Sequence, residues 1–301
     1  MCSSDLGKTL RNYGEACISE CGWSDRSMKG KPKWKDYHDD VIAKTGLTSI
    51  RCKPGLDSLR SFFKPDTVGW DLTVPDIVRA SRFIDELHHF EKTGKMPDFI
   101  IMLLPNDHTG GTGAGTPTPA AQVADNDLAM GQIVEALSHS KFWPDTCLFA
   151  IEDDPQNGWD HVSGYRTTCY VVSPYTKRSA VVSTQYNQTS LVRTMELMLG
   201  LPPMNIMDAT ATPMADCFTD TPDLTPFTAV PNQVSLLELN PEKKKQPDPK
   251  KRKDAETSAQ LDLTEPDRCP EDVFNRILWR AMKGTEVPYP EWAITKVDDD
   301  D

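Results

Sequence analysis

The stretch Thr146-Cys-Leu-Phe-Ala-Ile-Glu-Asp-Asp-Pro-Gln-Asn-Gly-Trp-Asp-His161 decides the fold and indicates the chemistry of this chain. The apolar run over residues 147–151 predicts a buried strand, which ends at three consecutive acids. A turn that contains glycine then brings another acid and a histidine. Carboxylates gathered at one strand end repel each other unless a cation or a set of donors offsets the repulsion. Oxygen and imidazole ligands suit a borderline or hard divalent metal, so the stretch predicts half of a metal site.

The fold class follows from the segments on either side. Residues 99–104 and 169–173 are continuous apolar runs, which are typical of strands buried on both faces of a sheet. Helices are expected over residues 74–91, where apolar residues recur at helical spacing, and over residues 120–138 and 189–199. Strands that alternate with helices predict an α/β fold with a largely parallel sheet flanked by helices.

Three parts are expected along the chain. Residues 1–241 form the main domain, ending in an extended arm rich in proline and threonine. Residues 242–260 carry many charges and prolines, so they predict a flexible, solvated loop. Residues 261–301 contain an amphipathic helix over 269–283, which we expect to dock back on the domain, and then an acidic tail.

Composition limits the classes of partner. The formal net charge of −12 disfavours nucleic acid, which a basic surface would bind. No apolar run approaches the roughly 18 residues of a membrane span, and no signal peptide is recognisable. Of the eight cysteines, Cys17, Cys21 and Cys52 could pair in an oxidising compartment, and the sequence leaves that open.

A second loop also carries an acid and a histidine, because Asp107 and His108 follow the apolar run over residues 99–104. In open α/β sheets, ligands gather at the carboxyl ends of parallel strands. The two loops would then meet at one sheet edge, where their carboxylates need a common partner. A capped turn is the simpler alternative for Asp107 and His108 taken alone. The glycine-rich residues 110–115 lack the ending of a phosphate-binding loop, so a nucleotide cradle is not expected.

These motifs together resemble the phosphoesterase branch of the alkaline phosphatase superfamily, which contains bacterial phospholipase C and acid phosphatases. Residues 151–162, Ile-Glu-Asp-Asp-Pro-Gln-Asn-Gly-Trp-Asp-His-Val, are similar to its acidic signature. Residues 105–112, Pro-Asn-Asp-His-Thr-Gly-Gly-Thr, look like its loop that supplies another site histidine. Shorter agreements occur at residues 124–131, 173–178 and 186–190. The resemblance covers roughly residues 8–240 and, more loosely, the final helix, and it implies an alkaline phosphatase-like fold.

The resemblance implies metal-dependent hydrolysis of a phosphoester, either a small molecule or a phospholipid head group. A metal-bound Ser or Thr attacks phosphorus in such enzymes, and water then hydrolyses the phosphoenzyme. The ion would be Zn, Mn, Ca or Mg. Bacterial relatives of this kind are often exported, which would place the parent protein in the periplasm or outside the cell. The residues that match metal-site positions are Asp153, Asp154, His161 and His108, and their neighbours Asp107, Glu152 and Asp160 are expected as further ligands or supporting groups.

One departure from the family pattern concerns the nucleophile. Complete members carry a first strand with an acid-Asn metal pair and a Ser or Thr nucleophile, both before the segment that Arg11-Asn-Tyr-Gly-Glu15 resembles. That segment lies near residue 1 here, so we expect an N-terminally truncated member that lacks its first strand, and a fragment with little activity alone. Residues 1–241 would then be the C-terminal portion of a phosphoesterase domain.

Two functions of other classes remain open. The chain could be a non-catalytic module that binds a divalent metal or a partner. It could also be a mononuclear metallohydrolase that uses metal-bound water, which requires three or four ligands within these residues.

Overall fold

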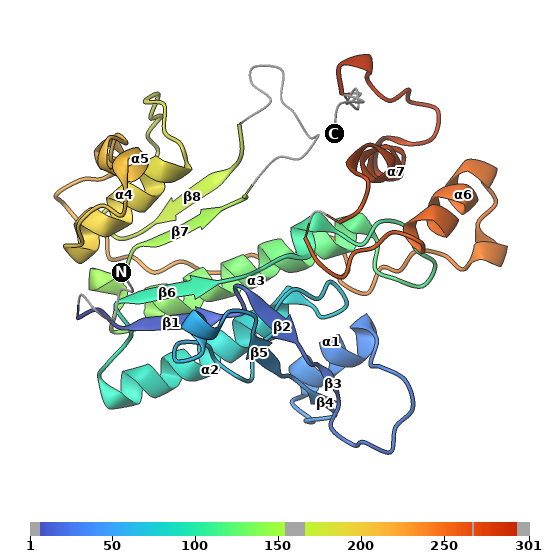
Figure 1. Cartoon of the computed structure of the whole chain (residues 1–301), viewed down its shortest axis with the longest axis horizontal. Coiled ribbons are helices and arrows are strands. Elements are labelled where there is room, and N and C mark those ends of the chain that lie inside the picture. The colour runs from blue at the N-terminus through green and yellow to red at the C-terminus, as the bar shows by residue number, and fades with distance from the viewer. Residues whose placement is uncertain (1–6, 154–165, 267, 294–301) are drawn as a thin grey trace.

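The computed structural model describes residues 7–153, 166–266 and 268–293. The fold is mixed α/β, as the sequence predicts, with helices packed beside short strands (Figure 1). Its helices are α1 (Trp34–Ala43), α2 (Asp76–Thr93), α3 (Pro119–His139), α4 (Gln188–Leu199), α5 (Ile206–Ala209), α6 (Pro249–Ser258) and α7 (Glu271–Lys283). Its strands are β1 (Leu10–Tyr13), β2 (Cys17–Ser19), β3 (Gly22–Trp23), β4 (Thr48–Ser49), β5 (Cys52–Pro54), β6 (Phe99–Met102), β7 (Leu148–Ile151) and β8 (Cys169–Val172).

The strands form two-stranded ladders within the described residues. β1 pairs with β6 in parallel, from Leu10 opposite Phe99 to Tyr13 opposite Met102. The other three ladders, β2–β5, β3–β4 and β7–β8, are antiparallel. The expected largely parallel sheet is therefore not confirmed. The apolar runs also differ from the prediction, because β6 is half-buried along its length, and Cys169 and Tyr170 of β8 are exposed.

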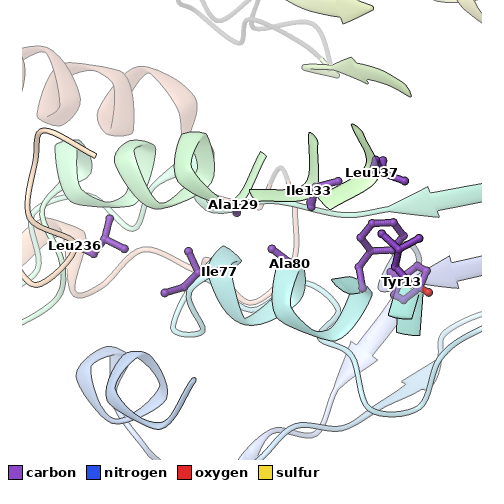
Figure 2. Packing of buried hydrophobic residues seen from close by; sticks show 9 residues of the cluster. Tyr13, Ile77, Ala80, Ala129, Ile133, Leu137 and Leu236 are labelled. Atoms are coloured by element: carbon purple, nitrogen blue, oxygen red, sulfur yellow. The ribbon is translucent and has the colours of Figure 1, made fainter. Parts of the chain in front are cut away.

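The main core lies between α2 and α3, whose apolar side chains face one another (Figure 2). The small residues Ala80 and Ala129 are both fully buried, which lets the two helices approach closely. Tyr13 of β1 joins this core, with its ring edge against Phe83 at a centroid distance of 5.4 Å. Leu236, from the arm between α5 and α6, packs at the opposite end of the core from Tyr13. These contacts hold β1, β6 and the two helices together.

The arm over residues 218–241 is extended and contains no helix or strand. It runs beside α3, where Ser138 Oγ accepts a hydrogen bond from the backbone N–H of Phe227 at 2.9 Å. Phe227 also packs edge-on against Trp143, and the Trp34 indole donates to the carbonyl oxygen of Leu236 at 2.8 Å. These contacts bring the chain back to the start of α3 before α6 begins.

Helix α6 occupies residues where a flexible loop was expected. Asp248 caps it by accepting hydrogen bonds from the backbone N–H groups of Lys250 and Lys251, and Pro249 stands at the first helical position. Asp254 of α6 forms a two-pronged ion pair with Arg280 of α7. The prolines of this segment start a helix rather than prevent one. None of the helices in the described residues has the length and apolar character that crossing a membrane requires.

Candidate functional site

The loop after β6 and the loop after β7 carry the candidate residues. The first continues from β6 into a 3₁₀ turn, Asn106–His108, and the second begins with Glu152 and Asp153. Glu152 accepts hydrogen bonds from the hydroxyls of Thr167 and Thr168, just before β8, at 3.2 and 3.1 Å. The side chain of Gln188, at the start of α4, donates to the backbone oxygen of Asp153. The residues just before β8 and the start of α4 therefore bond to Glu152 and Asp153, the described beginning of the second loop.

Asp107 and Glu152 are close enough to interact electrostatically. Part of the Asp107 side chain is open to solvent, yet desolvation by the surrounding protein raises the pKa of its carboxyl to about 6. The negative charges of Asp76 and Glu152 add to this upward shift. The acids of the two loops are thus within electrostatic range of each other, although the strands β6 and β7 belong to separate ladders.

One ring nitrogen of His108 makes a hydrogen bond, and the other is buried without one in the described part of the chain. Its Nδ1 lies 3.0 Å from the backbone oxygen of Thr109, and a carbonyl oxygen can only accept, so Nδ1 carries the proton. Nε2 is then a lone-pair acceptor. It is buried and has no hydrogen-bond partner among the described residues. A histidine that donates from one nitrogen to a carbonyl and keeps the other free has the arrangement usual for a metal ligand.

A buried polar network holds the turn that carries Asp107 and His108. The backbone N–H of Asn106 donates to Asp76 Oδ2, and its side-chain amide donates to Asp125 Oδ2, both at 3.0 Å. Arg79 pairs with Asp76 at 3.0 Å, and both side chains are fully buried. Asn126 donates to Asp76 Oδ2 at 3.1 Å and to the backbone oxygen of Leu104 at 2.9 Å. The turn is therefore fixed to the first turn of α2 and the second turn of α3.

Asp125, although it belongs to α3, also caps the N-terminus of α2. The helix begins after Pro75, which has no side chain that can accept a hydrogen bond, and Asp125 of α3 accepts from the backbone N–H groups of Asp76 and Ile77 instead. Burial raises the pKa of Asp125 to about 7, and the charge of Asp76 contributes. Burial also raises the pKa of Asp76, in spite of its pairing with Arg79. The pair of carboxyls, Asp125 and Asp76, therefore retains a shared proton at pH values where two ordinary aspartates are ionised.

Four of the predicted site residues fall in the described part of the chain: Asp107, His108, Glu152 and Asp153. The other three, Asp154, Asp160 and His161, lie outside the described residues. Over the described ranges alone, no group of three or more His, Cys, Asp or Glu side chains is arranged to hold a metal ion. The described candidates nevertheless fit a divalent cation in kind, because Asp107 and Glu152 are carboxylates and His108 keeps a ring nitrogen without a hydrogen-bond partner in these ranges.

Sequence reasoning did not identify the supporting network of Asp76, Arg79, Asn106 and Asp125. Its members lie up to 49 positions apart, and their contacts depend on how α2 and α3 pack. One signal was available, since Asp125 stands among apolar residues on the buried face of α3. A buried carboxylate on such a face requires donors from a neighbouring element.

Comparison with known proteins assigns the class. The Phosphoesterase family model matches residues 32–202, which is more than half of the chain and includes both acid-bearing loops. The chain therefore belongs to the Phosphoesterase family. No curated protein matches it, and no solved structure does. The family suggests that the protein hydrolyses phosphoric esters.

Proposed function

We propose that the protein is a metal-dependent phosphoester hydrolase of the alkaline phosphatase superfamily. The observation that carries this proposal is that Glu152 of one loop lies within electrostatic range of Asp107 of the other, inside the family-matched region, while the adjacent His108 keeps a ring nitrogen without a hydrogen-bond partner among the residues that the structure describes. Acidic side chains that crowd one place raise each other's pKa unless a cation neutralises them. A phosphoester also needs positive charge against its oxygens. A divalent ion would meet both requirements.

In this proposal Asp153, Asp154, His161 and His108 hold the metal, and Asp107, Glu152 and Asp160 are further ligands or orient the ligands. The ion, which could be Zn, Mn, Ca or Mg, would supply charge neutralisation of the phosphoryl oxygens and a lower pKa for the attacking hydroxyl. His108 contributes a fixed lone pair, because its Nδ1–H is held by the Thr109 carbonyl. Thr167 and Thr168 orient Glu152 by hydrogen bonding.

We propose that the residues named above bind and polarise the phosphoester, and that a Ser or Thr hydroxyl attacks it. The substrate is then a small phosphomonoester or phosphodiester, or the head group of a phospholipid. Residues 1–301 should bind metal and phosphate.

The proposal is tested with purified residues 1–301 and p-nitrophenyl phosphate or its bis ester, in the presence of Mn²⁺, Zn²⁺ or Ca²⁺. Asp153→Ala and His161→Ala variants are compared with Asp145→Ala, which removes an exposed acid at the opposite end of β7. Metal binding is measured on the same samples by calorimetry. We expect binding that both site variants lose and Asp145→Ala keeps.

Three outcomes would change the proposal. Equal metal affinity in all variants would contradict the assigned ligands. Rapid turnover that both site variants keep would show that hydrolysis does not depend on the assigned ligands. Metal binding without any phosphate binding would favour the non-catalytic module over the hydrolase.

A further inference from the structure

Helix α7 contacts the candidate site although it lies outside the family-matched residues 32–202. The ring of Phe274 stacks on the imidazole of His108, with centroids 5.4 Å apart and an interplanar angle of 23°. Phe274 is 1% exposed, so this contact is part of the packed interior. A residue far along the chain thus covers one face of the predicted metal-site histidine.

A second aromatic ring meets the same histidine. Trp70 approaches His108 edge-on at a centroid distance of 5.2 Å and an interplanar angle of 83°. The indole N–H of Trp70 donates to the backbone oxygen of Leu263 at 3.0 Å, in the segment between α6 and α7. The C-terminal segment therefore positions both rings that contact His108.

The glycine-rich loop after His108 is held by the same segment. A Cβ on Gly111 would lie 2.7 Å from Ser258 Oγ and 3.2 Å from Phe274 Cε2, and its φ of +73° is in the left-handed region that favours glycine. Ser258 Oγ accepts a hydrogen bond from the backbone N–H of Thr112 at 3.0 Å. Asn240 donates to the backbone oxygen of Gly111 at 3.2 Å. The loop and the end of α6 fit together too closely for a side chain at residue 111.

These contacts restrict the imidazole to one orientation. The Thr109 carbonyl holds Nδ1–H, and the rings of Phe274 and Trp70 exclude water and limit rotation of the imidazole. The Nε2 lone pair is then presented in one direction. Groups that orient a metal-bound histidine in this way contribute strongly to metal affinity.

We propose that Phe274 of α7 is a positioning residue for His108, with Trp70 as the second ring of the same aromatic enclosure. The C-terminal segment is thereby part of the site and not an appendage to it. The effect on metal affinity rests on the proposed function, whereas the effect on the orientation of His108 does not.

The test uses residues 1–301 with Phe274→Leu, which keeps an apolar side chain in place but removes the ring. Phe83→Leu is the matched control, because Phe83 is also buried, at 2% exposed, and packs on Tyr13 in the α2–α3 core. Trp70→Leu removes the other ring, and it replaces Phe274→Leu as the test variant if Phe274→Leu does not fold. The readouts are the ¹⁵N shifts of the His108 imidazole without metal, assigned with His108→Gln, and the Zn²⁺ affinity by calorimetry.

Wild type and Phe83→Leu should show a single His108 tautomer protonated on Nδ1. Phe274→Leu should show mixed tautomers and bind Zn²⁺ about 10- to 100-fold more weakly, as is typical when a group that orients a ligand is lost. Unchanged shifts in both Phe274→Leu and Trp70→Leu would overturn the proposal. Mixed tautomers in a protein that binds no Zn²⁺ even as wild type would support the positioning role and contradict the proposed function.

Discussion

Asp125 of α3 joins three parts of the structure near the site: α3 itself, the start of α2 and the turn that carries the candidate residues. It caps α2 through the N–H groups of Asp76 and Ile77, and it holds the amide of Asn106, next to the residues that carry the chemistry. These partners are buried, so water cannot replace Asp125 if it is removed. A buried donor left without an acceptor costs about 1–3 kcal/mol.

Asp125→Ala should therefore lower the free energy of unfolding by about 1–3 kcal/mol, because it leaves the N–H groups at the start of α2 without an acceptor. Urea denaturation measures this change. Asp127→Ala is the control, since Asp127 is exposed on the same helix and should change stability by less than about 0.5 kcal/mol. Equal losses in the two variants would show that Asp125 does not have this structural role.

The pH dependence of stability follows from the raised pKa of Asp125. An ordinary aspartate has a pKa of about 3.9, whereas Asp125 in the folded chain has a pKa of about 7. The folded protein thus keeps a proton that the unfolded chain releases. The contribution to stability is fully present below pH ~4 and is lost as the pH rises through ~7. Asp76 and Asp107 shift in the same direction.

We therefore expect the free energy of unfolding to fall between pH 5 and pH 8, with a smaller fall in Asp125→Asn. Chemical denaturation at several pH values measures both slopes. Carboxyls with a lowered pKa, such as Asp66, act in the opposite direction only at more acidic pH. A wild-type slope that Asp125→Asn reproduces would assign the effect to other groups.

At the scale of elements, helices could be predicted better than ladders. Residues 74–91, 120–138 and 189–199 were expected to be helical, and α2, α3 and α4 lie within two residues of those bounds. Local spacing of apolar residues determines such helices. Strand pairing depends on contacts between distant segments. The expectation of a largely parallel sheet is not confirmed, since β1 pairs with β6 in parallel but β7 pairs antiparallel with β8.

The charge and proline content of residues 249–258 made helix α6 hard to predict from the sequence. Its residues, Pro249–Ser258, are mostly charged, so no apolar stripe signals a helix. The signals were a cap, Asp248, followed by proline at the first helical position. Tertiary contacts supply the rest, since Asp254 is 6% exposed and bonded to Arg280 of α7.

Asp254→Ala should loosen α6 from α7, because it leaves Arg280 without its two-pronged partner. Since Arg280 is partly exposed, we expect a local loss of about 1–3 kcal/mol. Hydrogen exchange of the α6 amides measures it. Glu256→Ala is the control, because that acid is exposed and pairs with Lys243 on the surface. Slow exchange preserved in Asp254→Ala would contradict the role of the ion pair.

At the scale of the whole molecule, the sequence indicated the candidate ligands but not what holds them. Asp107 and Glu152 were expected to share one sheet edge, and the structure places them within electrostatic reach. The residues that fix His108 come from distant segments: Trp70 lies on the loop before α2 and Phe274 on α7. No local pattern marks such pairs, because packing alone brings them together.

A bound phosphate should stabilise the folded protein only when a metal is present, because the ion would supply the charge that attracts the anion. At a concentration of 100 times its dissociation constant, a ligand adds about 2.7 kcal/mol to the free energy of unfolding. Thermal unfolding with inorganic phosphate, with and without Mn²⁺, measures this dependence. Equal stabilisation without Mn²⁺ would indicate an anion site elsewhere.

The central claim is that the loops after β6 and β7 together form one site that binds a divalent metal. Calorimetric titration of residues 1–301 with Zn²⁺ or Mn²⁺ tests it most directly, with His108→Ala from one loop, Asp153→Ala from the other, and Asp145→Ala as control. We predict saturable binding that either site variant weakens at least about tenfold and that Asp145→Ala leaves unchanged. Binding that survives in both site variants, or no binding by the folded wild type, would contradict the account.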